Sequence, residues 1–159
     1  MESLLFKGGI EMSLTYQNIL VAVDGSNEAD LAFKRAIQVA INNNGSQMYI
    51  VHVIDTRIFA VYESYNRDFA ERANEMATEK LKGYEQRAIE AGVKKVETII
   101  EYGSPKDIIA RDIPKTKQID LIICGVTGRG GVERFIMGSV SEAIVRSAKC
   151  DVLVVRTLL

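Results

Sequence analysis

The residues with the clearest chemical potential lie in one glycine-rich segment near the carboxyl end of the chain. This segment, GVTGRGGVERFIMGSV, runs from Gly125 to Val140 and holds five of the twelve glycines. Within it, Gly125, Gly128, Gly138 and Ser139 follow the spacing Gly-two-Gly-nine-Gly-Ser. Because glycine has no Cβ, Gly125 and Gly128 could take a positive φ and let the backbone approach a bulky anion closely. The spacing therefore predicts a cradle for phosphate groups.

A helix is expected to begin where this loop ends, over residues 139–149. Its first amide groups and its dipole would then face the loop, as in other anion sites. The hydroxyls of Ser139 and Ser141 are candidate donors to phosphate oxygens, and Arg129 and Arg134 could add positive charge. The loop matches neither the Walker A motif nor the GxGxxG fingerprint. We therefore expect micromolar nucleotide binding without covalent phosphate chemistry.

Several of these positions also fit purely structural roles. Ser139 and Glu142 match the Ser-x-x-Glu capping box, in which the serine begins its own helix. Asp24 follows an apolar run and could accept hydrogen bonds from adenine or ribose, or it could cap the helix after Ser26. His52 is the only histidine and lies in an apolar run, which favours a satisfied core residue over a catalytic or metal-binding one. The sequence offers no acid-base pair and no metal-ligand spacing.

Alternating apolar and amphipathic segments would position these residues. The sequence predicts strands at residues 18–24, 47–55, 94–103, 119–125 and 151–157, and helices at 27–42, 68–91, 104–114 and 139–149. This alternation is typical of a parallel sheet with right-handed crossovers and helices on both faces. Ligands of such open sheets bind beyond the carboxyl ends of the strands. Asp24, the turn after the second strand and the glycine loop all fall there.

Finer signals define the predicted helices. Ser26 is a candidate N-cap, and the short helix has Ser104 as its cap, Pro105 in its first turn and Pro114 as its stop. Residues 56–67 have no clear period, so they form either a flap or a variable surface excursion. The long helix should bury one stripe and expose a charged face. The stripe is Phe69, Ala73, Met76, Ala77, Leu81, Tyr84 and Ala88, and the charged face includes Glu71, Arg72, Glu75, Glu79, Lys80 and Lys82.

Length and composition indicate one ordinary globular domain. The chain has 159 residues, is 47% hydrophobic and 26% charged, and carries a formal charge of -1, which gives no bias toward nucleic acid or anionic membranes. Cys124 and Cys150 lack CxxC spacing and are expected to be buried thiols. Without a membrane-spanning run or a signal peptide, a cytoplasmic location is expected. Residues 1–13 are interpreted as an extension that need not be ordered, and residues 14–159 as the domain.

Three stretches resemble the universal stress protein family: YQNILVAVDGS, VHVID and GVTGRGGVERFIMGSVSEAIVRSAKCDVLVVR. The resemblance covers about residues 12–156. It implies a doubly wound, Rossmann-like sheet of the adenine nucleotide alpha hydrolase-like type, with strand order 3-2-1-4-5. It also implies a homodimer and bound ATP or another adenine nucleotide, with Mg²⁺ as an optional companion. The dimer would pair the apolar last strand, Asp151 to Arg156, which is an aggregation hazard when uncovered; the alternative is that the extension covers it.

The resemblance also implies roles for individual residues. Asp24 would lie near adenine and ribose, Val53 beside adenine, and Ala22 and Cys124 in the neighbouring wall. Some relatives have proline at Ala22 and many have methionine at Cys124, but both departures keep the wall apolar. The remaining positions would contact the ribose and the phosphates. Together, the predicted nucleotide-binding residues are Ala22, Asp24, Val53, Cys124, Gly125, Gly128, Arg129, Gly138, Ser139, Val140 and Ser141.

These observations support three hypotheses for function. The leading one is a dimeric, ATP-binding regulatory protein of stress physiology, without nucleic-acid or membrane partners. The second is a slow ATPase or autophosphorylating enzyme with Thr127, Ser139 or Ser141 as acceptor, although the sequence shows no positioned base or catalytic lysine. We therefore assign no catalytic residue and expect at most weak ATP hydrolysis. The third is a nucleotide-free interaction module, which would not need the glycine spacing.

Overall fold

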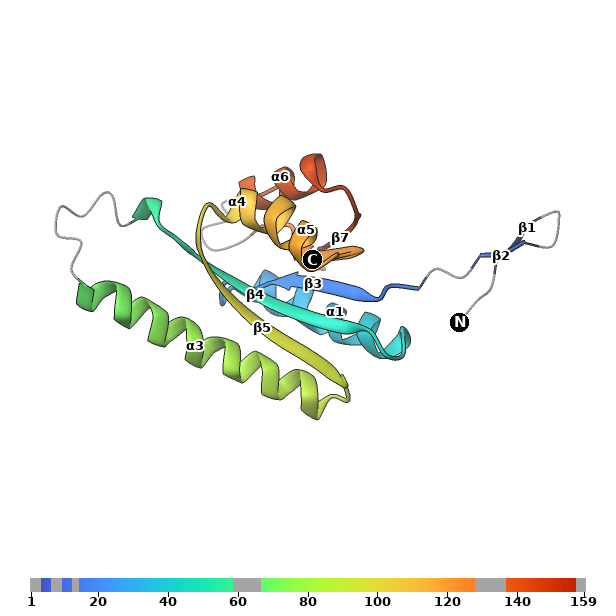
Figure 1. The fold of residues 1–159 in the computed structure, drawn as a ribbon, viewed down its shortest axis with the longest axis horizontal. Coiled ribbons are helices and arrows are strands. Elements are labelled where there is room, and N and C mark those ends of the chain that lie inside the picture. Colours follow the sequence, from blue (N-terminus) through green and yellow to red (C-terminus); the bar gives the residue numbers. More distant parts are fainter. Residues whose placement is uncertain (1–3, 7–9, 13–14, 59–66, 128–136, 157–159) are drawn as a thin grey trace.

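The core of the fold is a five-stranded parallel sheet. The computed structural model describes residues 4–6, 10–12, 15–58, 67–127 and 137–156 (Figure 1). The sheet has the order β5-β4-β3-β6-β7, which confirms the predicted order 3-2-1-4-5. Its strands are β3 (Asn18–Ala22), β4 (Gln47–Asp55), β5 (Lys95–Gly103), β6 (Leu121–Gly125) and β7 (Asp151–Val155).

The central strand β3 is apolar because both of its faces are covered. Ile19, Leu20 and Val21 are completely buried. Leu20 pairs with Tyr49 of β4 on one side and with Ile122 of β6 on the other. A parallel strand with helices on both faces needs such a continuous apolar run, so the sequence of β3 fixes its central position.

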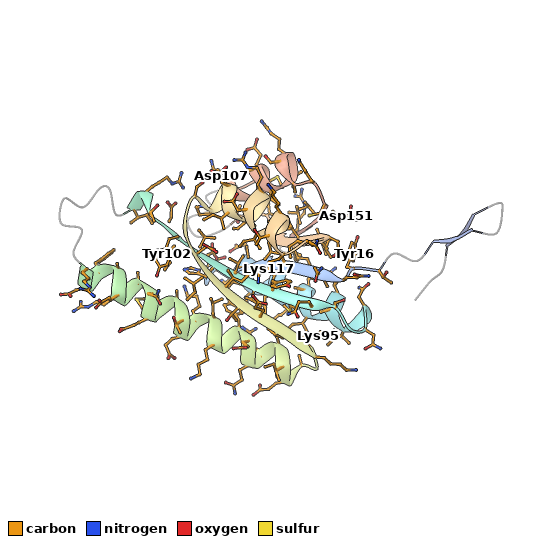
Figure 2. The ribbon with its side chains drawn as sticks, viewed as in Figure 1. Tyr16, Lys95, Tyr102, Asp107, Lys117 and Asp151 are labelled. Atoms are coloured by element: carbon orange, nitrogen blue, oxygen red, sulfur yellow. The ribbon has the colours of Figure 1, made fainter. Side chains whose placement is uncertain are left out.

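Two helical layers cover the sheet, and side chains fill the space between the layers (Figure 2). The residues of α1 (Asn27–Asn42) and α3 (Arg67–Glu90) form one core cluster with the sheet. The opposite cluster contains residues of the π-helical turn η1 (Ile108–Asp112), α5 (Ile113–Thr116) and α6 (Ser139–Ser147), and α4 (Pro105–Asp107) leads into η1. None of the described helices is long and apolar enough to cross a membrane.

The predicted beginnings of two helices are confirmed. Ser26 is the N-cap of α1, and its Oγ accepts a hydrogen bond of 3.1 Å from the amide of Ala29. Ser104 occupies the cap position of α4 and Pro105 the first helical position, although the Ser104 side chain makes no capping hydrogen bond. Because Ser26 caps α1, it fixes the residue at which the helix begins after β3.

The prediction that Pro114 ends the short helix is wrong. The helical segment continues to Thr116 through the π-helical turn, in which the amide of Ile113 donates to the carbonyl of Ile108, five residues earlier. A proline inside an α-helix lacks an N–H and clashes with the preceding turn. Because α5 begins at Ile113, Pro114 lies in a first turn, where no such hydrogen bond is needed.

The predicted buried stripe of α3 is correct only for its carboxyl-terminal half. Ala77, Leu81, Tyr84 and Ala88 are buried, whereas Phe69 is 48% exposed and Met76 is 72% exposed. In Figure 1, α3 diverges from β4 and β5 toward its amino end, so no strand lies beneath its first turns. Helical periodicity identifies an apolar face, but it does not say how far the supporting sheet extends.

The amino-terminal extension contains a small hairpin. β1 (Leu4–Phe6) and β2 (Ile10–Met12) pair with each other as an antiparallel two-stranded sheet. The hairpin lies beyond the amino end of β3, away from the larger sheet (Figure 1). Within the described ranges neither strand pairs with β7, so the alternative in which this extension covers the β7 edge is not what the structure shows.

We expect Phe33→Ala to lower the free energy of unfolding by about 3 to 5 kcal/mol. Phe33 is completely buried and packs edge-to-face on Tyr84, with ring centroids 4.7 Å apart. The matched control is Phe69→Ala on the exposed part of α3, which should cost at most about 1 kcal/mol. Urea denaturation measures both values, and equal losses would contradict the assignment of Phe33, rather than Phe69, to the core.

Candidate functional site

The carboxyl ends of three neighbouring strands lie side by side at one edge of the sheet. They belong to β4, β3 and β6, and parallel strands end at the same edge. The chain passes from β3 through α1 to β4 on one side, whereas β6 lies on the other side of β3. This reversal of strand order is the place where open α/β sheets form a ligand crevice. The predicted site residues on these strand ends therefore lie at one edge of the sheet.

Asp24 supports the turn between β3 and α1. Its Oδ1 accepts a hydrogen bond of 2.9 Å from the amide of Ser26. Ser26, rather than Asp24, caps α1. Between them, Gly25 has a φ of +82°, a conformation that glycine adopts without strain. This turn presents the Asp24 carboxylate at the edge of the sheet with one oxygen engaged by the backbone.

Gly125 has a different role from the predicted one. Its φ is not positive, so that part of the prediction is wrong. A Cβ at this position would lie 3.0 Å from both Cβ and the carbonyl oxygen of Glu28 in the first turn of α1. Gly125 is therefore required because α1 packs directly against the end of β6. It brings the amino end of α1 and the glycine loop together.

Gly138 closes the base of the glycine loop. Its amide donates a hydrogen bond of 2.8 Å to the carbonyl of Val126, and a Cβ here would lie 3.2 Å from Thr127 Cα. The Ser141 hydroxyl is buried and donates toward the carbonyls of Val126 and Gly138. A hydroxyl has one hydrogen, so it satisfies one acceptor at a time. These contacts hold the two ends of the loop together.

The predicted capping box at the start of α6 is wrong. Gly138 is the N-cap, Ser139 is the first helical residue, and Glu142 pairs with Arg146 at 2.6 Å. Within the part of the chain that the structure describes, no side chain caps α6. The first amides of a helix have no partner inside that helix. The amides of residues 139–141 therefore point out of α6 at the base of the glycine loop, beside the exposed Ser139 side chain.

An apolar wall adjoins these amides. Cys124 is 4% exposed, and Ala22, Val53 and Val140 are half-buried against the same core cluster. All four therefore lie on the α6 side of the sheet, as a shared pocket wall requires. Burial raises the pKa of the Cys124 thiol to about 11, so this wall is uncharged at neutral pH. Cys124 and the half-buried Cys150 are free thiols, as predicted.

His52 has the structural role that was predicted. Its Nδ1 lies 2.8 Å from the carbonyl oxygen of Val23, and this ring nitrogen donates the hydrogen bond. The amide of Val23 donates to the carbonyl of Val51 at 2.9 Å. These two bonds extend the contact between β3 and β4 beyond the last ladder pair. His52 thus fixes the strand ends that carry Asp24 and Val53.

Lys80 lies near the site but was not predicted from the sequence to do so. It was assigned to the solvated face of α3, yet its Nζ lies 3.5 Å from the carbonyl oxygen of Asp24. A Cβ on Gly25 would lie 3.1 Å from this Nζ, so the glycine leaves room for the lysine. The available signal was position, because Lys80 is three residues after Ala77 and four before Tyr84, at the border of the buried stripe.

Three predicted loop residues, Gly128, Arg129 and Arg134, lie outside the described residues. Among the residues that the structure does describe, no group of three or more His, Cys, Asp or Glu side chains could hold a metal ion.

Comparisons with known proteins agree with this geometry. The model of the Universal stress protein family matches residues 15–156. The Staphylococcus haemolyticus protein SH1215, named as a universal stress protein, is 54% identical over 144 residues, which cover 91% of this chain and 87% of that protein. The structure of hypothetical protein MJ0577 superposes with a TM-score of 0.82 and 27% identity over 92% of this chain and 99% of its own. A universal stress protein in complex with cAMP gives 0.66 and 26% identity over 91% and 99%.

We expect Gly125→Ala to destabilise the protein by about 1 to 3 kcal/mol, because the new methyl group would push the first turn of α1 from β6. Gly83→Ala is the matched control. Gly83 lies inside α3 with nothing within 4 Å of an added Cβ, so alanine should stabilise by about 0.5 to 1 kcal/mol. Thermal and urea denaturation measure both. A neutral or stabilising Gly125→Ala would show that the close contact with Glu28 does not require glycine.

Proposed function

Because the chain belongs to the universal stress protein family, we propose that it binds ATP or another adenine nucleotide and acts as a nucleotide-dependent regulatory protein. The observation that carries this proposal is the uncapped amino end of α6, which lies beside an uncharged apolar wall at the carboxyl edge of the sheet. Free helical amides bind anions, and an apolar wall accepts a planar base.

The phosphate end of the proposed site is built from backbone. The amides of residues 139–141 offer donors without lysine, and the Ser139 hydroxyl adds another. A helix terminus contributes about 0.3 to 1 kcal/mol, whereas a hydrogen bond to a charged group contributes about 1.5 to 3 kcal/mol. Three or four such bonds and a buried base reach the roughly 8 kcal/mol of micromolar binding. In this proposal Gly128 and Arg129 complete the cradle.

The base end of the proposed site is apolar with one carboxylate. Ala22, Val53, Cys124 and Val140 would contact the adenine ring or its ribose, and Asp24 would accept hydrogen bonds from ribose or from the adenine amino group. A neighbour of the same fold is a complex with cAMP, which supports an adenine nucleotide as ligand. Mg²⁺ would arrive with the phosphates, since the described residues offer no metal cluster of their own.

The nucleotide should copurify with the protein or bind it at micromolar concentration, and Gly128→Val should abolish that binding. A valine in the cradle would place a branched side chain where the phosphates approach. The matched control is Gly131→Val, in the same loop but outside the Gly-two-Gly-nine-Gly-Ser spacing. Chromatography of the released nucleotide and calorimetric titration with ATP make the measurement. The proposal would be refuted if the wild-type protein contains no nucleotide and if ATP gives neither a heat of binding nor an increase in its stability.

A second variant examines the base end in the same titration. Asp24→Asn keeps an oxygen that can accept the Ser26 amide, but it removes the negative charge. The turn should therefore persist while nucleotide affinity falls about tenfold or more, because a charge-assisted hydrogen bond is lost. Unchanged affinity would show that the Asp24 carboxylate does not contact the nucleotide. The phosphate cradle would still be tested separately by Gly128→Val.

We further propose that β7 pairs with β7 of a second copy. β7 is an edge strand, and its residues Val152, Leu153, Val154 and Val155 are only half-buried in the single chain. An apolar edge of this kind is normally paired or covered. A two-fold pairing would satisfy its outer backbone groups and close the assembly at two copies.

Analytical ultracentrifugation should give twice the chain mass of 17.6 kDa for the wild type. Val154→Lys should give the single-chain mass, because an ammonium group cannot be buried unpaired in an apolar strand interface. The control is Ile89→Lys, at an exposed apolar position of α3 on another part of the molecule. Circular dichroism verifies folding. A dimeric Val154→Lys variant that remains folded would place the interface elsewhere.

A further inference from the structure

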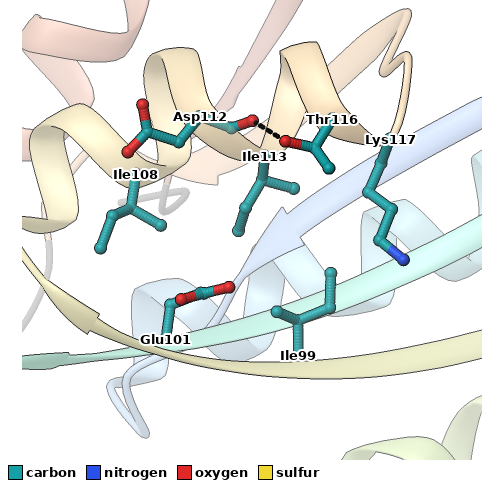
Figure 3. Close-up of a pocket in the computed structure, with 7 residues that line it drawn as sticks. All are labelled: Ile99, Glu101, Ile108, Asp112, Ile113, Thr116 and Lys117. Carbon is teal, nitrogen blue, oxygen red and sulfur yellow. Dashed lines mark hydrogen bonds between the residues drawn. The ribbon is translucent and has the colours of Figure 1, made fainter.

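A groove separates the edge strand β5 from the helical segment η1–α5, on the sheet face opposite α3 (Figure 3). Its volume is about 120 Å³. Ile99 and Glu101 form the strand wall. Ile108, Asp112 and Ile113 lie on the helical wall, and Lys117 closes one end. We propose that this groove receives a lysine or arginine side chain from an extended segment of a partner protein that pairs with the outer edge of β5.

The π-helical turn gives the helical wall its composition. Ile108 and Asp112 begin and end η1, and Ile113 follows directly, with its amide bonded to the Ile108 carbonyl. The wider turn brings residues five apart onto one face, so Ile108, Asp112 and Ile113 all line the groove. Such turns are frequent at functional sites. This one places the exposed Asp112 beside the two isoleucines of the helical wall, next to an edge strand.

The strand wall repeats this combination of apolar and acidic groups. Residues 97, 99 and 101 alternate along β5 and therefore face the same side. Ile99 forms an apolar floor, with Glu101 beside it toward the carboxyl end of the strand. Within the described part of the chain, the carboxylates of Glu101 and Asp112 take part in no hydrogen bond or ion pair. The groove therefore offers an isoleucine-lined channel with unneutralised negative charge.

Lys117, the cation among the described residues that line the groove, is already neutralised. Lys117 Nζ lies 2.6 Å from Glu97 Oε1 and 5.4 Å from the centre of the Tyr49 ring. The hydrogen bond to Glu97 raises the pKa of Lys117 and holds its ammonium group at that end of the groove. In Figure 3, Glu101 and Asp112 occupy the other end of the groove. The remaining charge of the groove is therefore complementary to a cation with an apolar stem, as in lysine or arginine.

The size of the groove and the neighbouring edge select a peptide over a small ligand. Pockets for small molecules measure roughly 300 to 1,000 Å³, well above this volume, which suits a single side chain. β5 is nine residues long and pairs only with β4 among the described strands, so half of its backbone groups face outward. An extended peptide can add to such an edge and place alternate side chains on one face. Two carboxylates without a third ligand do not make a metal site.

The test uses the whole protein labelled with ¹⁵N and the synthetic peptide Ac-Val-Thr-Lys-Thr-Val-amide as probe. Chemical-shift changes should concentrate at the amides of residues 97–103 and 108–117. Replacing the peptide lysine by norleucine, which keeps the stem and removes the charge, should weaken binding at least about tenfold. A norleucine peptide that binds equally well, or a lysine peptide that shifts no amide of these segments at millimolar concentration, would overturn the proposal.

Protein variants locate the charge that the peptide senses. Glu101→Gln and Asp112→Asn are exposed, nearly isosteric changes, and each should weaken the lysine peptide several-fold, whereas Glu75→Gln on α3 should not. Equal effects of all three would show that only overall charge matters and would contradict a specific groove. If n-butylammonium bound as tightly as the peptide, the ligand of the groove would instead be a free amine. The same shifts on concentrating the protein alone would indicate a second copy, and either result would refute the partner segment.

Discussion

The burial of β3 between two helical layers is the constraint on which the rest of the structure depends. Ile19, Leu20 and Val21 lose all contact with solvent, so β3 must lie between other strands and beneath helices on both faces. Its neighbours are β4 and β6, and the strand order reverses around it. The carboxyl ends of these three strands therefore lie side by side at one edge of the sheet. The position of the candidate site is thus a consequence of packing rather than of any residue in the site itself.

The glycines at this edge show how internal packing and ligand access are connected. Gly125 and Gly138 have ordinary φ values, and each is required by a neighbouring stretch of the same chain. They allow α1 and the loop base to pack closely, and among the described residues no side chain caps the amino end of α6. The first amides of α6 have no partner inside the helix, and the glycine at the N-cap position adds no side chain there. A glycine near a binding site can therefore act through the protein scaffold.

The sequence predicted the fold well because alternation and apolar runs are local signals. It predicted the sheet order, the Ser26 cap and a hydrogen-bonded structural role for His52. It failed where the outcome depended on tertiary geometry. Pro114 does not end its helix because a π-helical turn changes the hydrogen-bond register, and Phe69 and Met76 are exposed because α3 extends beyond the sheet. Lys80 of α3 contacts the backbone of Asp24 in the turn between β3 and α1. Helical periodicity does not predict a contact between residues so far apart in the sequence.

The two edges of the sheet differ in a way that limits how copies of the chain can associate. β7 carries Val152, Leu153, Val154 and Val155, whereas β5 carries the exposed charged residues Lys95, Glu97 and Glu101 on the sheet face toward η1 and α5. If both edges were apolar, one copy could add to the next through opposite edges and form an open filament. Charged residues on β5 make such head-to-tail pairing costly, because they would lie beside the apolar side chains of a paired β7 strand. In the proposed assembly, a β5 edge of this composition favours a partner that brings compensating charge, and the proposed self-association uses β7.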